Sequence, residues 1–216
     1  MAITIKIRHI GPVKEANIDL NKINVLMGPQ SSGKSTIAKI ISSCTWVEKD
    51  VATSQSLEMY QKRDNYFIDR LETFHKLKGY FKQEGRYISY KSNVIEIEYS
   101  ATHFSIEWND RYAYQRSKIS YIPSERNMVI LPDVENVELG NTNIRSFLWD
   151  WRDARKNYLK SEKMSILNLG VDYYYDEHSG EDHIAKIDNG EMLYFYFIRW
   201  STRFAQYESS FAGYRT

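Results

Sequence analysis

The feature that most constrains the fold is a glycine-rich loop placed between an apolar run and a helical pattern. The run Ile23–Met27, typical of a strand in a covered sheet, comes directly before the loop. Apolar residues then recur at helical spacing through Ile37, Ile40, Ile41 and Cys44. The loop itself has the Walker A pattern G-x-x-x-x-G-K-S and reads Gly28-Pro29-Gln30-Ser31-Ser32-Gly33-Lys34-Ser35. This order predicts an α/β fold, a P-loop NTPase lobe.

Each position of the loop has a chemical reason. Gly28 and Gly33 let the backbone turn tightly, so that successive amide N–H groups face an anion beside the helix start. Lys34 reaches the β- and γ-phosphates, and the Ser35 hydroxyl ligates Mg²⁺. Thr36 follows and is expected near the α-phosphate. The loop therefore predicts binding of ATP with Mg²⁺, against the alternative of a solvated Gly-Ser loop without a ligand.

A recognisable second Mg²⁺ ligand, the Walker B aspartate after an apolar strand, does not accompany the loop. Met128–Leu131 is followed by Pro132 and Asp133, and proline breaks strand pairing. Ile166–Val171 ends at Asp172, where Tyr173 stands in place of a second acid. Both aspartates are better explained as solvated carboxylates in turns than as Mg²⁺ ligands. The sequence therefore predicts nucleotide binding and leaves ATP hydrolysis open.

Composition excludes several classes of protein. With 29 basic and 28 acidic residues the net charge is +1. The overall charge therefore gives no indication that the protein binds nucleic acid or a membrane surface. The single cysteine, Cys44, excludes an internal disulfide framework and is expected to be buried and inert. No apolar run is long enough for a membrane span, and the N-terminus does not resemble a leader peptide. We expect a cytoplasmic protein.

The rest of the chain predicts a mixed or antiparallel β-rich portion with flanking helices. Residues 3–8 alternate as a half-buried strand, and a return strand is expected over Ala16–Leu20. Residues 54–83 carry a helical pattern, and a helix begins at Asn143. Further strands are expected at Tyr87–Tyr90, Val94–Tyr99, His103–Trp108 and Ile119–Ile122, and in a final meander from Ile166 with a hairpin turn at Asn189-Gly190.

Two other groups of residues have weaker functional interpretations. His178, His183 and Asp182 would make a weak metal site, although a polar hairpin tip explains them better. A basic stripe on the Asn143 helix suits DNA phosphates and equally suits a solvated face; it comprises Arg152, Arg155, Lys156, Lys160 and Lys163.

The loop, the strands before it and the segment Tyr121–Asn127 together resemble the N-terminal lobe of bacterial AAA-type ATPases with ABC/SMC/RecF-like heads. The resemblance covers roughly residues 1–175, with 54–83 as a helical insertion and 176–216 as an incomplete or altered C-terminal segment. It implies ATPase activity in a head-to-head homodimer, or with a partner ATPase or effector protein. It also places Glu125 or Arg126 where such heads sense the nucleotide; an exposed ion pair is the alternative for these two residues.

The chain departs from this family after the first lobe. A signature segment, an apolar strand ending in paired acids and a switch histidine are expected further along and are not recognisable. Aromatic residues crowd the end from Tyr194 to Tyr214, which suggests a truncated or altered-frame terminus. Two other functions stay open on the sequence: a small P-loop kinase, and an ATP-binding regulator that does not hydrolyse ATP.

Overall fold

The computed structural model divides the chain into two compact units, which we describe separately. The first comprises Met1–Tyr121 with Asn141–Asn143, and the second Ile122–Gly140 with Ile144–Thr216. The structure describes residues 3–63, 65–115, 119–130, 138–159, 161–166, 170–188 and 191–196.

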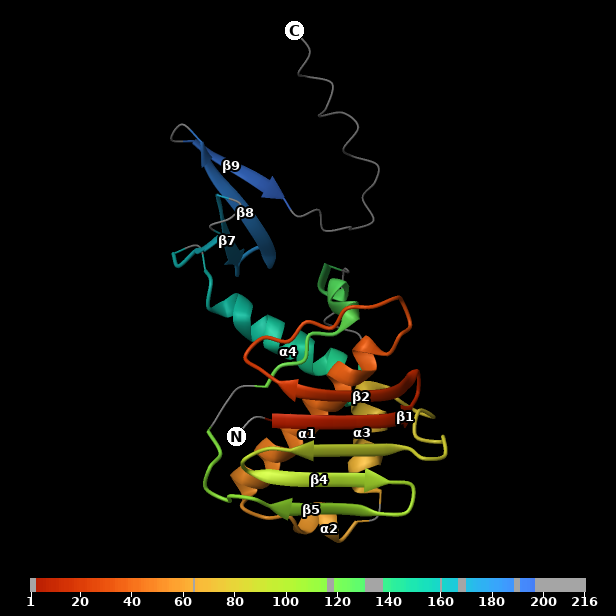
Figure 1. Ribbon diagram of the computed structural model, residues 1–216. Coiled ribbons are helices and arrows are strands. Elements are labelled where there is room, and N and C mark those ends of the chain that lie inside the picture. The colour runs from red at the N-terminus through yellow and green to blue at the C-terminus, as the bar shows by residue number, and fades with distance from the viewer. Residues whose placement is uncertain are drawn as a thin grey trace. The chain divides into compact units, whose positions relative to one another are not determined.

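A five-stranded antiparallel sheet forms the centre of the first unit (Figure 1). Its strand order is β2-β1-β3-β4-β5, so β1 lies between its return strand β2 and the later strand β3. Period-two alternation of apolar and polar residues explains why these segments form strands with one buried face. The strands are β1 (Ile3–Ile10), β2 (Val13–Leu20), β3 (Tyr87–Lys91), β4 (Ile95–Ser100) and β5 (Phe104–Trp108).

Helices cover one face of this sheet (Figure 1). They are α1 (Lys34–Ser54), α2 (Glu58–Gln61) and α3 (Tyr66–His75), which confirms the helix expected after the loop and two short helices within 54–83, whereas residues 76–83 form turns. Every large apolar side chain buried here contributes roughly 1.5–3 kcal/mol to folding. The core joins isoleucines of β1, β3, β4 and β5 with residues of the helices: Ile5, Ile7, Ile88, Ile95, Ile97, Ile106, Ile40, Val47 and Leu71.

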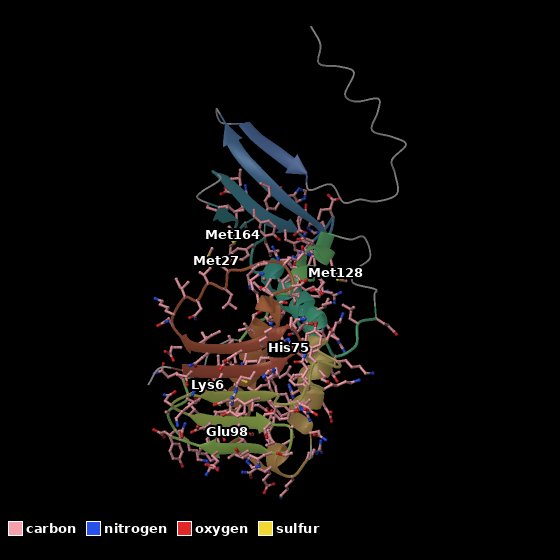
Figure 2. The ribbon with its side chains drawn as sticks, turned by 45° about the vertical axis from the view of Figure 1, so that its right-hand side comes forward. Lys6, Met27, His75, Glu98, Met128 and Met164 are labelled. Atoms are coloured by element: carbon pink, nitrogen blue, oxygen red, sulfur yellow. The ribbon has the colours of Figure 1, made fainter. Side chains whose placement is uncertain are left out.

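The opposite face of the sheet is polar. Lys6 on β1 aligns with Ser89 on β3, and Ser89 aligns with Glu98 on β4. Figure 2 shows Lys6 and Glu98 on this side and His75 on the helix side. Polar and charged side chains on neighbouring strands pair with one another on this face. For example, Lys91 Nζ lies 2.8 Å from Glu96 Oε2.

The second unit has its own antiparallel sheet in the order β6-β7-β8-β9. Arg155 of α4 connects to it: its guanidinium lies 3.0 Å from Asp182 Oδ1 and 3.9 Å from the ring centre of Tyr175. The elements are η1 (Ser124–Ile130), α4 (Asn143–Lys156), β6 (Met164–Ile166), β7 (Val171–Asp176), β8 (Glu181–Asp188) and β9 (Glu191–Tyr196).

The fold class is α/β with antiparallel sheets, and two expected strands are wrong. Ile23–Met27 forms no strand and is exposed throughout, because no described strand lies beside it to pair with its backbone. Ile119–Ile122 likewise has no strand pairing. The Asn189-Gly190 turn and the aromatic tail from residue 197 lie outside the described residues. The division near residue 175 stays a prediction.

Candidate functional site

The chain reaches the glycine-rich loop through an asparagine turn at the end of β2. The backbone N–H of Asn21 donates to Asn24 Oδ1 at 3.0 Å, and Asn24 Nδ2 donates back to the Asn21 carbonyl at 2.7 Å. Such asparagine turns redirect a chain leaving a strand. Beyond the turn the loop residues up to Ser32 are all exposed, so the loop is open to solvent.

Gly33 at the end of the loop lies against the turn between β1 and β2. Its φ is +91°, in the left-handed region, and a Cβ built there would meet Val13 Cγ2 at 2.6 Å. Both observations require glycine at this position. The start of α1 is thereby held close to the Pro12-Val13 turn, which fixes the loop's second end on the rigid sheet.

The N-terminus of α1 is open to an anion. Its cap is Gly33, which makes no side-chain capping bond, and no acid lies in the first turn. The first intrahelical bond runs from Ile37 N–H to the Gly33 carbonyl at 2.9 Å, so the amides of Lys34, Ser35 and Thr36 precede the helical ladder. Free amides and the positive end of the helix dipole point to phosphate binding.

A buried hydrogen bond ties the C-terminal half of α1 to the sheet. Tyr90 on β3 donates from its hydroxyl to Glu48 Oε2 at 2.6 Å, and both residues are buried. Burial raises the pKa of Tyr90, and the nearby Glu48 carboxylate raises it further, so the hydroxyl stays a donor. Sequence reasoning missed this pair, although Glu48 follows Cys44 by four residues on the apolar stripe.

Lys34 folds back over its own loop. Its ammonium nitrogen lies 2.8 Å from the Gly28 carbonyl oxygen, 2.5 Å from that of Pro29 and 3.4 Å from Ser32 Oγ. The loop therefore brings together Gly28, Pro29, Ser32 and Lys34 of the predicted set. Gln30 and Ser31 lie exposed at its tip, where Ser31 has a left-handed φ of +62°.

The next two residues of the helix face different surroundings. Ser35 is exposed, so its hydroxyl is free to meet a metal ion at the loop. Thr36 is only 3% exposed and packs into the helix side of the unit. A hydroxyl oxygen is a ligand that Mg²⁺ accepts, so the exposed Ser35 is compatible with the ion, and its contact with Mg²⁺ stays a prediction. The predicted contact of Thr36 with the α-phosphate stays a prediction.

The remaining predicted site residues lie in the second unit or outside the described residues. Glu125 is in η1, where it accepts a 2.8 Å hydrogen bond from Ser124 Oγ, and its role beside the nucleotide stays a prediction. Asp172 lies on β7 and accepts a bond from Ser165 Oγ at 2.7 Å. Asp133 lies outside the described residues.

Other chemistry is limited in the part of the chain that the structure describes. Cys44 is completely buried, which confirms the expected burial, and this burial raises the pKa of its thiol. Asp182 is paired with Arg155, and His183 stacks on Tyr174 with ring centres 4.9 Å apart. Among the described residues no group of three or more His, Cys, Asp and Glu side chains could hold a metal ion. The described helices include none long and apolar enough to cross a membrane.

Comparisons with known proteins place the chain in a family. Neither the curated proteins nor the solved structures contain a match. The family described as AAA domain matches residues 4–171, which spans the loop, the first sheet except Ile3, and α4. A match over more than half of the chain shows the family, and it confirms the resemblance drawn from the loop and its flanking strands. The chain belongs to the AAA domain family, as a lobe of an SMC/RecF-like AAA-type ATPase.

Proposed function

We propose that the Gly28–Ser35 loop binds the phosphates of Mg·ATP and that this unit acts as a P-loop NTPase lobe. The observation that carries the proposal is the open start of α1, with a glycine cap, no acid in its first turn and a lysine as its first residue. A helix of 21 residues without a side-chain cap presents the positive end of its macrodipole at this point. Membership of an ATPase family supports the same assignment.

Each residue has a distinct part in the proposed site. The amides of Lys34 and Ser35 donate to the β-phosphate, and the Lys34 ammonium adds a positive charge beside the γ-phosphate. The Ser35 hydroxyl oxygen would ligate Mg²⁺. The ion neutralises charge on the β- and γ-phosphate oxygens when it is bound. Gly33 keeps the backbone close enough for these contacts, since a side chain there would strike Val13.

Calorimetric titration with Mg·ATP tests the assignment. We expect Lys34→Ala to weaken triphosphate binding by about tenfold or more, because a charged hydrogen bond contributes roughly 1.5–3 kcal/mol. Lys6→Ala is the matched control, since Lys6 is exposed on the sheet face opposite the helices. Unchanged binding in Lys34→Ala would refute the site.

Phosphate release measured on the same samples separates the possible activities. Release that Lys34→Ala abolishes supports an ATPase, the activity of the family. ATP binding without release supports a regulator that does not turn over ATP, and phosphate transfer to an added metabolite supports a small kinase. Sedimentation with and without Mg·ATP tests the proposed head-to-head dimer.

A further inference from the structure

The turn between β1 and β2 is held by a segment that lies far from it in the sequence. Gly11 and Pro12 form this turn, between the last residue of β1 and the first of β2. The Gly11 N–H donates to the Tyr80 carbonyl at 3.1 Å, and Gln83 Nε2 donates to the Gly11 carbonyl at 2.9 Å. Both backbone polar groups of Gly11 are therefore bonded to the segment that follows α3.

The Tyr80 ring lies against the same glycine. A Cβ built at Gly11 would lie 2.2 Å from Tyr80 Cδ2 and 2.7 Å from Tyr80 Cε2, which is closer than non-bonded atoms come. The φ of Gly11 is +51°, in the left-handed region that favours glycine. A larger residue at this position would have to displace either the ring or the turn.

The segment that holds Gly11 is itself fixed. We call residues 77–83 the 77–83 segment. Leu77 is 2% exposed and Phe81 is 6% exposed, so two of its side chains are anchored in the core. The N–H of Leu77 donates to the Glu72 carbonyl at 3.0 Å, and that of Gly79 donates to Glu72 Oε1 at 3.1 Å. Because packed interiors yield little, the 77–83 segment is a firm support for the turn.

The two residues after Gly11 contact the start of α1. A Cβ built at Gly33 would lie 2.6 Å from Val13 Cγ2 and 3.4 Å from Pro12 Cγ. Contacts thus run without a break from the 77–83 segment, through the turn, to the residue that precedes α1.

Binding groups need to lie within about 0.5 Å of their productive positions, so a small displacement of this support matters at the helix start. We propose that Tyr80 is a positioning residue, which acts through Gly11 and the turn to set where the first amides of α1 lie. The inference rests on the proposed function, since those amides are the proposed phosphate donors.

Amide resonances of the protein without nucleotide test the positioning role. Tyr80→Ala removes the ring, so we expect the ¹H–¹⁵N resonances of Gly33 and Lys34 to shift, whereas Tyr80→Phe keeps the ring and should leave them in place. Gly11→Ala crowds the ring and should shift the same resonances. Unchanged Gly33 and Lys34 resonances in Tyr80→Ala would overturn the proposal.

Gly79→Ala is the matched control for the glycine variant. Gly79 also has a left-handed φ, +85°, but the nearest atom to a Cβ there is Lys82 Cε at 4.0 Å. The substitution therefore strains the backbone of the 77–83 segment without crowding the turn. We expect the Gly33 resonance to stay in place, and a shift as large as that in Gly11→Ala would contradict the proposed route.

Calorimetric titration with Mg·ATP links the position of α1 to binding. We expect Tyr80→Ala to weaken binding by roughly tenfold, because small misplacements of binding groups carry penalties of this order. Tyr80→Phe and Gly79→Ala should match wild type. Urea unfolding of the same samples measures stability separately: a purely structural role would lower the stability of Tyr80→Ala and leave the affinity of its folded form unchanged, which would contradict the proposal. If wild type binds no Mg·ATP, the proposed function fails, and the amide resonances alone decide whether Tyr80 positions α1.

Discussion

Two apolar segments near the N-terminus differ sharply in burial. In β1, the side chains of Ile5, Ile7 and Ile10 are completely buried. In the segment Ile23–Met27, the exposed fractions are 80% at Ile23, 76% at Val25 and 87% at Met27. Figure 2 shows Met27 on the loop that follows β2, away from the strands of the sheet. Similar composition thus gives opposite outcomes.

Neighbours account for the difference. β1 pairs with β2 along one edge and with β3 along the other, and the helices cover its apolar face. The Ile23–Met27 segment has no backbone partner among the described residues. Apolar side chains contribute to stability only when other groups remove them from water, so the same residue types contribute fully in β1 and little in the exposed segment.

The largest expected effect tests this contrast by truncating one isoleucine in each segment. Ile5→Ala should lower the free energy of unfolding by about 3 kcal/mol, because it removes buried methyl groups and leaves a cavity. Ile23→Ala should change it by less than about 0.5 kcal/mol, as for other exposed positions. Urea unfolding followed by circular dichroism measures both values. A loss at Ile23 comparable to that at Ile5 would mean that the exposed segment is packed.

The sequence predicted the elements whose signal is local. Alternation in Val94–Tyr99 and helical spacing after Lys34 describe faces of single elements, and the structure has β4 and α1 at these places. Ile23–Met27 and Ile119–Ile122 were wrong for a common reason. A run of apolar residues reports that a segment would be stable when covered, but it contains no information about what covers it.

The candidate phosphate-binding site was also only partly predictable from the sequence. The pattern of Gly28, Gly33 and Lys34 identified the loop, because those residue types have a direct chemical reason there. The contact of Gly33 with Val13 and the contacts of Lys34 with the Gly28 and Pro29 carbonyls depend on the path of the backbone in space, which residue spacing in the sequence does not record. The burial of His75 was also not foreseen, since a histidine among charged residues is usually solvated.

Acid should weaken the first unit through His75. This residue is 2% exposed, and Nδ1 has no hydrogen-bond partner there. Burial, followed by the charges of Lys39 and Arg70, lowers the pKa of His75 from 6.5 to about 4. The unfolded chain then takes up a proton first as pH falls, so stability is complete above pH 6.5 and is lost between 6.5 and 4.

At pH 5 the expected loss is about 2 kcal/mol relative to pH 7.5. Unfolding by urea across this range measures the slope, and His75→Gln should flatten it because the glutamine does not titrate. An unchanged slope in His75→Gln would assign the acid sensitivity to other groups. This test extends the contrast between the two segments, because a packed region such as the one around His75 keeps a histidine uncharged at pH 5, whereas a solvated histidine is protonated there.

The last comparison concerns two tyrosine–glutamate pairs on opposite faces of the same strand. Tyr90 donates to Glu48 at 2.6 Å in the core, and Tyr87 donates to Glu98 at 3.0 Å on the outer face. Tyr90→Phe leaves a buried carboxyl without its donor and should cost about 1–3 kcal/mol. In Tyr87→Phe water replaces the lost partner, so the loss should stay below about 0.5 kcal/mol. Equal losses in urea unfolding would show that the outer face is covered, and would contradict the view that burial decides what each pair contributes.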